Sequence, residues 1–555
     1  MDLAQVWQTL ICLLLASVAT AQTQPYRLMV RLPDKAGTSF TVQQPQAFLS
    51  ARSLARRAKF SIPIRERDLP VSAVYLQQLS GLGLSVEKSS KWLNAVVVAG
   101  DSAFIAQKLT QLSWGGTAPK VQVSRALGPS KHVELCDNTA GTSTSLNYGI
   151  GTSQARMLGI DSMHARGFTG RGVMVAVMDA GFQIVDRHIA FRHMIDSGRL
   201  ADTRDYVFGQ GNSVFGVHWH GGAAYGCIGG YMPGSFIGGA YQADYAFYIT
   251  EDIRSEAPIE MFNWVVAAER ADSLGVDLIN TSLGYYTFDK PWLNFSPEQM
   301  TGQVSFLADA LDYATETGIV CVTSAGNEGG NPTWGGKITT PADARLGIAV
   351  GAVGPDSALV NFSGRGLGRS NNIKPDVVAQ GIRVALYDWN NPAGAGGGGA
   401  GTSFSAPLVS GLLAGMMQQF PNVKPSQWLE ALRATSNNAA RPDTLLGYGI
   451  PNYGRLARYL SRLTDTNAPV TLQARVYPNP ALVGQPTVIQ MAAGFKIQQI
   501  VLTDVLGRVV GTYGPATGQP SMASLQLGTL PAGSYGYQII TPQGAVRGRL
   551  VVAKH

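Results

Sequence analysis

The chain has 555 residues, which is too long for one compact core and predicts about three or four structural units. Hydrophobic residues make up 45% and exclude a broadly disordered chain, whereas charged residues make up only 14%, as in loop-rich extracellular proteins. The formal net charge is +7 without a basic block, so a nucleic-acid-binding protein is not expected. No apolar run after residue 25 is long enough to span a bilayer.

The first 21 residues predict a signal peptide. An apolar stretch from Val6 to Val18 precedes Ala19-Thr20-Ala21, the small-x-small pattern of a cleavage site. The start of the chain departs from the usual pattern because it carries Asp2 and no Lys or Arg. A short buried helix or a membrane anchor is the alternative, but the stretch is short for a span. We expect cleavage before Gln22.

The small number of cysteines is consistent with an exported protein. After cleavage three cysteines remain, Cys136, Cys227 and Cys321. An odd number permits at most one disulfide, which excludes a disulfide framework, and the sequence does not decide whether any two of them pair. No cluster of Cys and His has the spacing of a structural zinc site, so we predict no metal site.

Residues 22–130 predict a small α+β domain. Strand-like runs occupy 26–32, 93–98 and 121–123, and helical patterns occupy 45–59, 71–82 and 102–112. Residues 131–164 begin with a polar stretch rich in Gly, Ser and Thr, which predicts a linker or lead-in arm.

Residues 165–462 predict a second, larger domain with an α/β fold. Continuous apolar strands at 173–179, 276–284, 318–327 and 346–353 alternate with helices at 257–274, 303–317 and 403–417. This order is typical of a doubly wound parallel sheet that is covered on both faces. The glycine-rich segment 394–401 is predicted to be a loop. Residues 475–555 carry short strands separated by turns and predict a small all-β domain.

Three residues have the chemistry of an activated hydroxyl. Asp179 ends a buried strand, His220 precedes a pair of glycines, and Ser403 lies between the glycine-rich segment and a helix of small residues. A serine nucleophile needs a histidine to take its proton, and the histidine needs a buried carboxylate to orient it. The positive end of a helix also favours a developing oxyanion next to Ser403.

Each of these residues has a plainer structural interpretation. Asp179 can be a strand-end cap, Ser403 a helix N-cap, and His218 with His220 half of a metal site that lacks a third ligand. The other five histidines have ordinary neighbours and predict no site: His132, His164, His188, His193 and His555.

The segment 165–460 resembles the catalytic domain of subtilisin-like serine proteases, the subtilases. The order Asp, His, Ser along the chain matches subtilisin. The motifs that carry the resemblance are Val173–Asp179, Asn280-Thr281-Ser282-Leu283-Gly284, Ser324-Ala325-Gly326-Asn327-Glu328, Phe362-Ser363, Lys374–Ala379 and Gly401-Thr402-Ser403-Phe404-Ser405-Ala406-Pro407. The resemblance implies a catalytic triad of Asp179, His220 and Ser403, an oxyanion-binding Asn327, and substrate-binding segments Ser282-Leu283-Gly284 and Ala325-Gly326.

Two positions depart from the family's motifs. Ala180 follows the aspartate where Ser or Thr is common, and His220 is followed by Gly-Gly-Ala where the family usually has Gly-Thr-His. Extra glycine in a helix costs about 1 kcal/mol relative to alanine. We therefore expect a weaker helix behind His220, and the sequence does not decide whether activity suffers.

The flanking regions resemble two further modules. Residues 22–130 resemble the inhibitory propeptides of subtilases, with a characteristic segment at Ser90–Val96. Residues 475–555 resemble the C-terminal sorting domain of proteins exported by the type IX system of Bacteroidetes. The residues that carry this second resemblance are Tyr477–Pro480, Asp504–Arg508, Leu530–Tyr535 and Gly548–Val552. A small β-sandwich binding module is the alternative for this region.

These features predict a secreted or cell-surface serine endopeptidase that is made as a zymogen and reaches the exterior through the periplasm. We expect protein or peptide substrates, the chain's own propeptide and the outer-membrane secretion machinery as partners. No cofactor is required, and structural calcium stays open. The alternative is an inactive subtilase-like binding or adhesion protein. A serine esterase of the α/β-hydrolase fold is not expected, because this chain has the order Asp, His, Ser and contains no GxSxG motif at the candidate serine.

Overall fold

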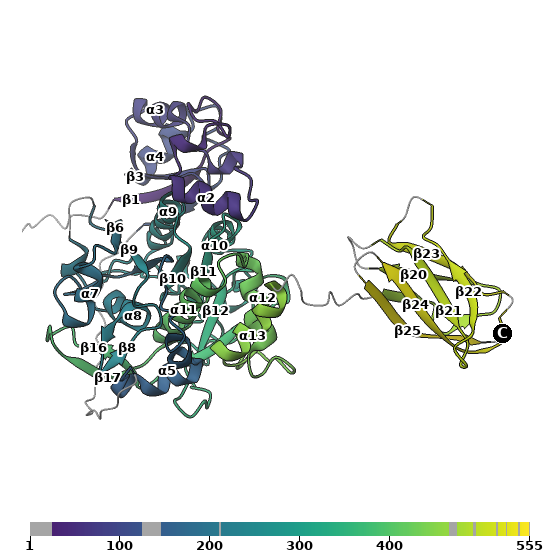
Figure 1. Ribbon diagram of the computed structural model, residues 1–555. Coiled ribbons are helices and arrows are strands. Elements are labelled where there is room, and N and C mark those ends of the chain that lie inside the picture. The colour runs from purple at the N-terminus through teal and green to yellow at the C-terminus, as the bar shows by residue number, and fades with distance from the viewer. Residues whose placement is uncertain are drawn as a thin grey trace, which may run out of the picture. The chain divides into compact units, whose positions relative to one another are not determined.

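Seven strands form the central sheet, in the order β15-β12-β11-β10-β5-β9-β6, and every neighbouring pair is parallel (Figure 1). Parallel neighbours require crossover connections, and here helices supply them on both faces of the sheet. The predicted doubly wound α/β fold is confirmed. The strands are β5 Met174–Asp179, β6 Leu200–Asp205, β9 Asp244–Ile249, β10 Leu278–Thr281, β11 Val320–Ser324, β12 Ile348–Val353 and β15 Val377–Gln380.

The coordinates form a computed structural model, which describes residues 25–124, 146–209, 213–464, 474–491, 496–517, 520–528, 530–541 and 544–553. The predicted signal peptide, Cys136, His132, His555 and the arm before residue 146 lie outside the described residues. The chain divides into one unit that ends at Leu460 and a second that begins at Ser461.

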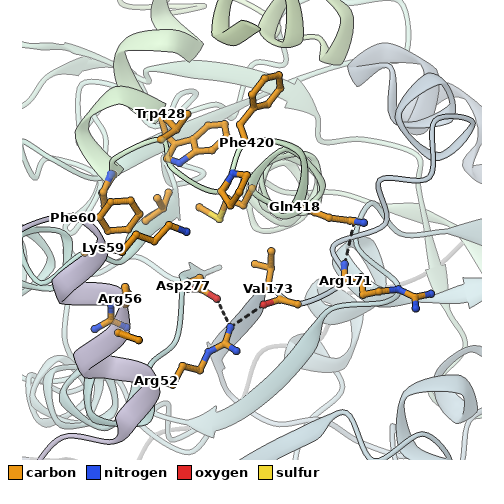
Figure 2. A pocket seen from close by; sticks show the side chains of 18 residues that line it. Arg52, Arg56, Lys59, Phe60, Arg171, Val173, Asp277, Gln418, Phe420 and Trp428 are labelled. Carbon is orange, nitrogen blue, oxygen red and sulfur yellow. Dashed lines mark hydrogen bonds and ion pairs between the residues drawn. The ribbon is translucent and has the colours of Figure 1, made fainter. Parts of the chain in front are cut away.

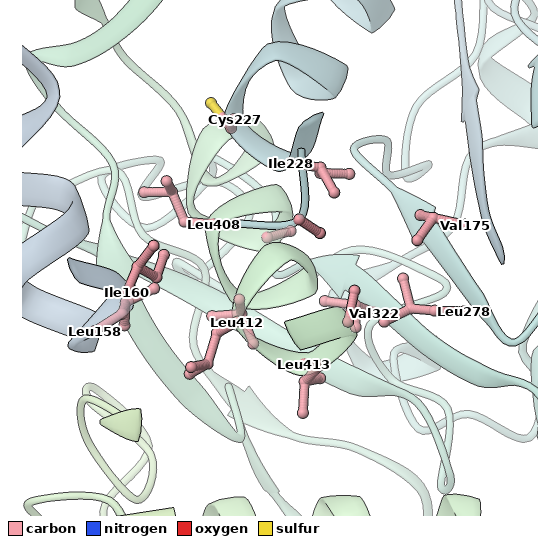
Figure 3. Close-up of a cluster of buried hydrophobic side chains, with 14 of the residues drawn as sticks. Leu158, Ile160, Val175, Cys227, Ile228, Leu278, Val322, Leu408, Leu412 and Leu413 are labelled. Carbon is pink, nitrogen blue, oxygen red and sulfur yellow. The ribbon is translucent and has the colours of Figure 1, made fainter. Parts of the chain in front are cut away.

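Two hydrophobic core clusters lie on opposite faces of the sheet, as the alternation of side chains along each strand requires. In β5, Val175 and Val177 belong to the first cluster, whereas Met174, Ala176 and Met178 belong to the second. Figure 3 shows Leu408, Leu412 and Leu413 of the long helix α11 beside strand residues of the first cluster. Helices α9 and α10 cover the second face. The helices of this domain are α5 Thr152–Leu158, α6 Ile160–His164, α7 Arg192–Ile195, α8 His220–Gly229, α9 Ile259–Leu274, α10 Phe306–Glu316, α11 Thr402–Gln419, α12 Pro425–Thr435 and α13 Tyr453–Thr464.

Residues 146–164 belong to the core of the large domain although they fall within the predicted lead-in arm. They form α5 and α6, and Leu158, Ile160 and Met163 are buried in the first cluster. Gly159, in the left-handed conformation at φ 72°, separates the two helices. The core therefore begins about 20 residues earlier than the apolar strand pattern indicates.

The prediction of a loop over 394–401 is wrong. Ala395–Gly399 is strand β17, which pairs antiparallel with β16, Val384–Tyr387. A strand needs only backbone hydrogen bonds, and β16 supplies the buried side chains for both. A Cβ atom at Gly399 would lie 2.7 Å from the Leu386 side chain, so glycine permits this close approach. Two other short hairpins are β7 Tyr231–Met232 with β8 Phe236–Ile237, and β13 Gly366–Leu367 with β14 Ile373–Lys374.

The N-terminal domain is a four-stranded antiparallel sheet in the order β2-β3-β1-β4 with three helices, which agrees with the predicted α+β class. The polar edge strand β2 lacks an apolar run and was not predicted from the sequence. The elements are β1 Tyr26–Arg31, α2 Ala51–Lys59, α3 Ala73–Gly81, β2 Ser85–Ser90, β3 Ala95–Gly100, α4 Ser102–Leu109 and β4 Lys120–Gln122.

This N-terminal sheet is buried on both faces (Figure 1). Val96 and Val98 of β3 face its own core under α3 and α4, whereas Ala95 and Val97 join the cluster that contains α9. Both faces of β3 are therefore apolar, which accounts for the continuous run at 93–98.

Charged groups reinforce the contact between the N-terminal domain and α9. The Asp272 carboxylate lies 2.6 Å from Arg56, 2.9 Å from Arg57 and 3.2 Å from Lys91, and Asp272 is fully buried. Burial raises the pKa of Asp272, but the three cations outweigh burial and the net pKa is lowered. Glu269, one turn earlier, accepts hydrogen bonds from the Ser90 hydroxyl and from the Lys91 and Trp92 backbone N–H groups.

The C-terminal unit is an all-β domain, as predicted. A three-stranded sheet, β18-β20-β23, and a five-stranded sheet, β19-β25-β24-β21-β22, enclose one core that includes Ile489, Leu525, Ile500 and Leu550. The strands are β18 Ala474–Tyr477, β19 Ala481–Leu482, β20 Pro486–Met491, β21 Gln499–Thr503, β22 Val509–Tyr513, β23 Met522–Gln526, β24 Gly533–Thr541 and β25 Gly544–Ala553.

Two of the three cysteines that would remain after signal-peptide cleavage lie in the described residues. Cys227 and Cys321 are buried and free, in different core clusters, and do not pair with each other. Among the described residues, no helix has both the length and the apolar character needed to cross a bilayer.

The buried charges around Asp272 predict a large stability effect. In a chain with Ser403→Ala, which removes the candidate nucleophile, Asp272→Ala removes the carboxylate that Arg56, Arg57 and Lys91 share and leaves Arg57 with Asp68 alone. Breaking a buried ion pair in this way costs about 3–5 kcal/mol. The measurement is trypsin digestion of the N-terminal domain across a urea series. Asp196→Ala, which removes an exposed pair with Arg192, is the control and should cost below about 1 kcal/mol. Identical curves for the two variants would contradict the prediction.

Candidate active site

The predicted site residues gather at one edge of the central sheet. Asp179 ends β5, Ser282 follows β10, and Asn327 lies three residues beyond β11. These three strands are neighbours and parallel, so their carboxyl ends lie at the same edge, where doubly wound sheets bind ligands. Helix α11 begins beside them at Thr402 and carries Ser403 in its first turn.

Asp179 and His220 are hydrogen-bonded. The distance from Asp179 Oδ1 to His220 Nδ1 is 2.8 Å, and the same oxygen accepts the Ala180 backbone N–H at 2.7 Å. Asp179 has no solvent exposure, whereas 22% of the His220 side chain is exposed. The buried carboxylate thus fixes the ring by its Nδ1 and leaves Nε2 available to another group.

The electrostatics of the pair favour a protonated imidazole. Burial lowers the pKa of His220, but the charge and the hydrogen bond of Asp179, with a smaller contribution from Glu251, outweigh burial, so the net pKa is raised. Burial also raises the pKa of Glu251 to about 7, although the hydroxyls of Tyr285 and Thr250 donate to its carboxylate.

The Ser403 hydroxyl lies beside this pair but donates elsewhere. Its Oγ donates to the Ser282 carbonyl at 3.0 Å, and among the described residues no hydrogen bond joins it to His220. The ring of Phe404, the next residue, lies 5.7 Å from the His220 ring, centroid to centroid. The structure therefore brings Asp179 and His220 into contact and places Ser403 next to them with its hydroxyl turned to β10.

Pro407 explains the second contact between Ser403 and Ser282. A helical carbonyl normally accepts the N–H four residues later, but Pro407 has none, and its ring crowds the Ser403 carbonyl. The Ser282 hydroxyl donates to that carbonyl at 2.8 Å. Ser282 thus accepts from the Ser403 side chain and donates to its backbone, so it positions Ser403 in addition to its predicted place in a substrate-binding segment.

A buried chain of hydrogen bonds continues from Ser282. Asn280 Nδ2 donates to Ser282 Oγ at 3.0 Å, and the Ser410 hydroxyl donates to Asn280 Oδ1 at 2.8 Å. Asn280 and Ser410 have no solvent exposure. The sequence motifs do not predict this role for either residue, although a polar asparagine within an otherwise apolar strand is a signal of such a buried contact.

Asn327 is held by its amide oxygen. The backbone N–H and the hydroxyl of Thr402 both donate to Asn327 Oδ1 at 2.9 Å. A Cβ atom at Gly401 would lie 3.5 Å from Asn327 Nδ2 and 3.7 Å from the Ser403 backbone nitrogen. The absence of a side chain at Gly401 therefore leaves a space beside two donors, the arrangement needed to hold an oxyanion.

The glycines after His220 are required by packing. A Cβ atom at Gly221 would lie 2.7 Å from Asp179 Cβ, and one at Gly222 would lie 2.4 Å from the Tyr387 hydroxyl. That hydroxyl donates to the Gln183 and Trp219 carbonyls. Alanine does not fit at either position without a shift of its neighbours, so packing accounts for both glycines. The expected weaker helix stays a prediction. Helix α8 forms over His220–Gly229.

A cleft of about 960 Å³ borders the site. Its lining includes Trp219, which precedes His220, together with Leu283, Gly284 and Glu328. Trp219 stacks on Trp389 with ring centroids 4.1 Å apart, which gives the cleft a rigid aromatic wall. This volume is at the upper end of the range of small-ligand pockets, about 300–1,000 Å³.

A second cavity, of about 320 Å³, lies away from the site (Figure 2). Arg52, Arg56 and Lys59 of α2 face Val173 and Asp277, which precede β5 and β10. It therefore lies at the amino edge of the sheet, opposite to Asp179 and Ser403, and its walls come from the N-terminal and catalytic domains together.

The geometry agrees with the outcome of the comparisons with known proteins. A family model described as the subtilase family matches residues 170–449, just over half of the chain. The chain belongs to the subtilase family. A second model, described as the peptidase S8 propeptide domain of Bacteroidota, matches residues 27–127. The predicted resemblance of the N-terminal domain to a subtilase propeptide is confirmed, whereas the C-terminal sorting domain stays a prediction.

Several bacterial proteins are similar to this subtilase. Subtilisin of Bacillus pumilus is 29% identical over 297 residues, which are 53% of this chain and 92% of that protein. Subtilisin E of Bacillus subtilis (strain 168) is 29% identical over 293 residues, 53% of this chain, and the match spans only 66% of its length. The crystal structure of MycP1 from Mycobacterium smegmatis has a TM-score of 0.43 and 22% identity, over 59% of this chain and 89% of that chain.

The raised pKa of His220 gives a direct test of the electrostatics of this subtilase. A neighbouring carboxylate stabilises the imidazolium, so the His220 pKa should lie above the ordinary value of about 6.5. Asp179→Asn should lower it, because the amide has no charge. The measurement is an NMR titration of the histidine ring in the Ser403→Ala chain. Asp186→Asn, which removes a carboxylate that does not contact His220, should leave the titration unchanged. An unaltered midpoint in Asp179→Asn would refute the assigned cause.

Proposed function

We propose that the chain is a secreted serine endopeptidase, made as a zymogen, that cleaves peptide bonds with Asp179, His220 and Ser403. The observation that carries the proposal is the 2.8 Å hydrogen bond between the buried Asp179 carboxylate and His220, at the same sheet edge as Ser403. Family membership and the adjoining propeptide domain support it.

The proposed reaction begins with rotation of the Ser403 hydroxyl. A substrate backbone N–H that donates to the Ser282 carbonyl competes with Ser403 for that acceptor, which frees the hydroxyl for His220 Nε2. Ser403 Oγ then bonds to the peptide carbonyl carbon while its proton passes to Nε2, and Asp179 stabilises the resulting imidazolium.

The oxyanion of the tetrahedral intermediate occupies the space beside Gly401. Asn327 Nδ2 and the Ser403 backbone N–H donate to it. Collapse of the intermediate breaks the C–N bond, and the leaving amine takes the proton from His220. Water then hydrolyses the acyl-enzyme by the same steps in reverse order, with His220 as the base. The proposed chemistry needs no cofactor.

Substrate segments lie along the residues that follow β10 and β11. Ser282-Leu283-Gly284 and Ala325-Gly326 leave neighbouring strands, and Ser324 Oγ donates to the Leu283 carbonyl at 3.0 Å. Peptide or protein substrates are therefore the proposed class. The inactive binding protein remains the competing hypothesis, and only an activated serine reacts with a fluorophosphonate.

The oxyanion assignment predicts the effect of Asn327→Leu. Removal of one such donor lowers turnover by about 10²–10³ in subtilisin, and we expect a similar loss in peptide hydrolysis here. Labelling of Ser403 by a fluorophosphonate should persist, because Asp179 and His220 are unchanged. Ser403→Ala serves as the control and should abolish labelling. Unchanged turnover in Asn327→Leu would defeat the oxyanion role, and failure to label the natural chain would favour the inactive binding protein.

We further propose that residues 475–555 direct export, after a signal peptide at 1–21 delivers the chain to the periplasm. The C-terminal unit has its own core and strands, which supports a module that is independent of catalysis. The outer-membrane secretion machinery is the proposed partner.

Deletion of residues 475–555 should therefore retain the protease inside the cell envelope. The truncated chain should hydrolyse peptides in vitro at the full rate, because the core of the catalytic unit is untouched. The measurement is activity in the periplasm and in the medium of cells that express each form. Equal release of both forms would refute the sorting role and favour a binding module.

A further inference from the structure

The segments that follow β10 and β11 lead to Ser282 and Asn327 at the candidate site. The two strands are paired up to Thr281 and Thr323. Gly284 and Gly326 then face a common gap, and Gly326 has a left-handed φ of 97°, which favours glycine.

The side chain of Thr339 fills this gap. A Cβ atom built at Gly284 would lie 2.1 Å from Thr339 Oγ1, and one built at Gly326 would lie 2.7 Å from the same oxygen. Thr339 is only 2% exposed. Neither glycine could carry a side chain unless Thr339 moved, so the three residues close the gap together.

Backbone bonds hold Thr339 in place. Its N–H donates to the Ala325 carbonyl at 3.2 Å, and the next residue, Thr340, pairs with Tyr285 through N–H···O distances of 2.8 and 3.2 Å. Thr339 is therefore tied to both segments. The large cleft is lined by Leu283, Gly284 and Glu328, and within the described residues neither Gly326 nor Thr339 contributes to its lining.

We propose that Thr339 is a specificity-determining residue that limits the side chain on the acyl side of the cleaved bond to a small one, such as that of Ala or Ser. This inference rests on the proposed function. With the carbonyl carbon at Ser403 Oγ and its oxygen at Asn327 Nδ2, the adjoining Cα lies over the segment that leads into Asn327. Its side chain then points at the gap that Thr339 occupies, which leaves no depth for a large group.

The Thr339 hydroxyl adds a polar element to this shallow site. Its Oγ1 is buried and has no hydrogen-bond partner among the described residues. A serine side chain on the substrate supplies such a partner, whereas the rings of Phe and Tyr and the branched chain of Leu exceed the available space. Shape therefore excludes large residues, and the hydroxyl favours Ser.

The test compares peptide substrates that differ only in the residue before the cleaved bond, with Ala, Ser, Leu and Phe in that position. The full chain, matured by release of its propeptide, should show a kcat/KM for Ala and Ser at least about 10-fold above that for Leu and Phe, since a single methylene group in a pocket discriminates by about 10–200-fold. Thr339→Gly should raise kcat/KM for Phe at least about 10-fold and change that for Ala much less.

Thr339→Val is the matched control, because valine has nearly the same shape and lacks the hydroxyl. It should keep the discrimination against Phe and lose part of the preference for Ser over Ala. The fluorophosphonate labelling rate reports whether each variant retains its catalytic site. A labelled natural enzyme that prefers Phe or Leu would overturn the inference alone, as would a labelled Thr339→Gly variant with unchanged selectivity. Failure to label the natural enzyme would overturn the proposed function and this inference with it.

Discussion

The position of Ser403 depends on a backbone carbonyl that helix α11 cannot satisfy by itself. Pro407 lacks the N–H that the Ser403 carbonyl would accept, and the hydroxyl of Ser282 donates in its place. From Ser282 the hydrogen bonds lead through Asn280 to Ser410, two turns further along the same helix. The start and the middle of α11 are thus joined to one strand, β10. Because every polar group in this buried chain has a partner, the chain fixes the register between helix and strand.

The same strand end also organises the rest of the site. Ser282 is followed by the segment that faces Gly326, and β11 next to it leads to Asn327. Asn327 in turn is held by Thr402, the first residue of α11. A displacement of α11 would therefore move the serine and the amide together. The distance between Ser403 and Asn327 is kept by three elements that bond to one another, not by any one of them alone.

The contact with the propeptide follows from the charge at the end of α9. Asp272 lies in the last turn of this helix and Glu269 one turn earlier, where the helix dipole disfavours negative charge. Arg56, Arg57 and Lys91 outweigh the burial of Asp272, so its net pKa is lowered. Backbone N–H groups of the propeptide offset only part of the burial of Glu269, so its net pKa is raised. This contact lies on the helical face of the domain, away from the catalytic edge. In the proposed zymogen, release of the propeptide returns these carboxylates to water without breaking any hydrogen bond of the network around Ser403.

Much of this arrangement could be predicted from the sequence, because its strongest signals are local. Continuous apolar runs predicted four of the seven strands of the sheet, β5, β10, β11 and β12, but not β6, β9 or β15. The chain order of Asp179, His220 and Ser403 led to the family. Features that depend on packing between distant segments could not be predicted. Gly396 to Gly399 form a strand because β16 lies alongside, and Gly222 is required because Tyr387, more than 160 residues later, occupies the space of a side chain.

The orientation of the Ser403 hydroxyl could not be predicted from the sequence motif. A motif identifies the residue, but the acceptor of its proton is set by which oxygen or nitrogen lies nearest in the folded chain. In this structure that acceptor is the Ser282 carbonyl, 3.0 Å away, and not His220. The difference between the two orientations is one rotation about the Cα–Cβ bond, for which a staggered alternative exists. A ligand that occupies the Ser282 carbonyl therefore changes the balance between them. The strand end that fixes the backbone of Ser403 thus also controls where its hydroxyl points. In the proposed reaction, this contact couples occupation of the Ser282 carbonyl by substrate to activation of the serine.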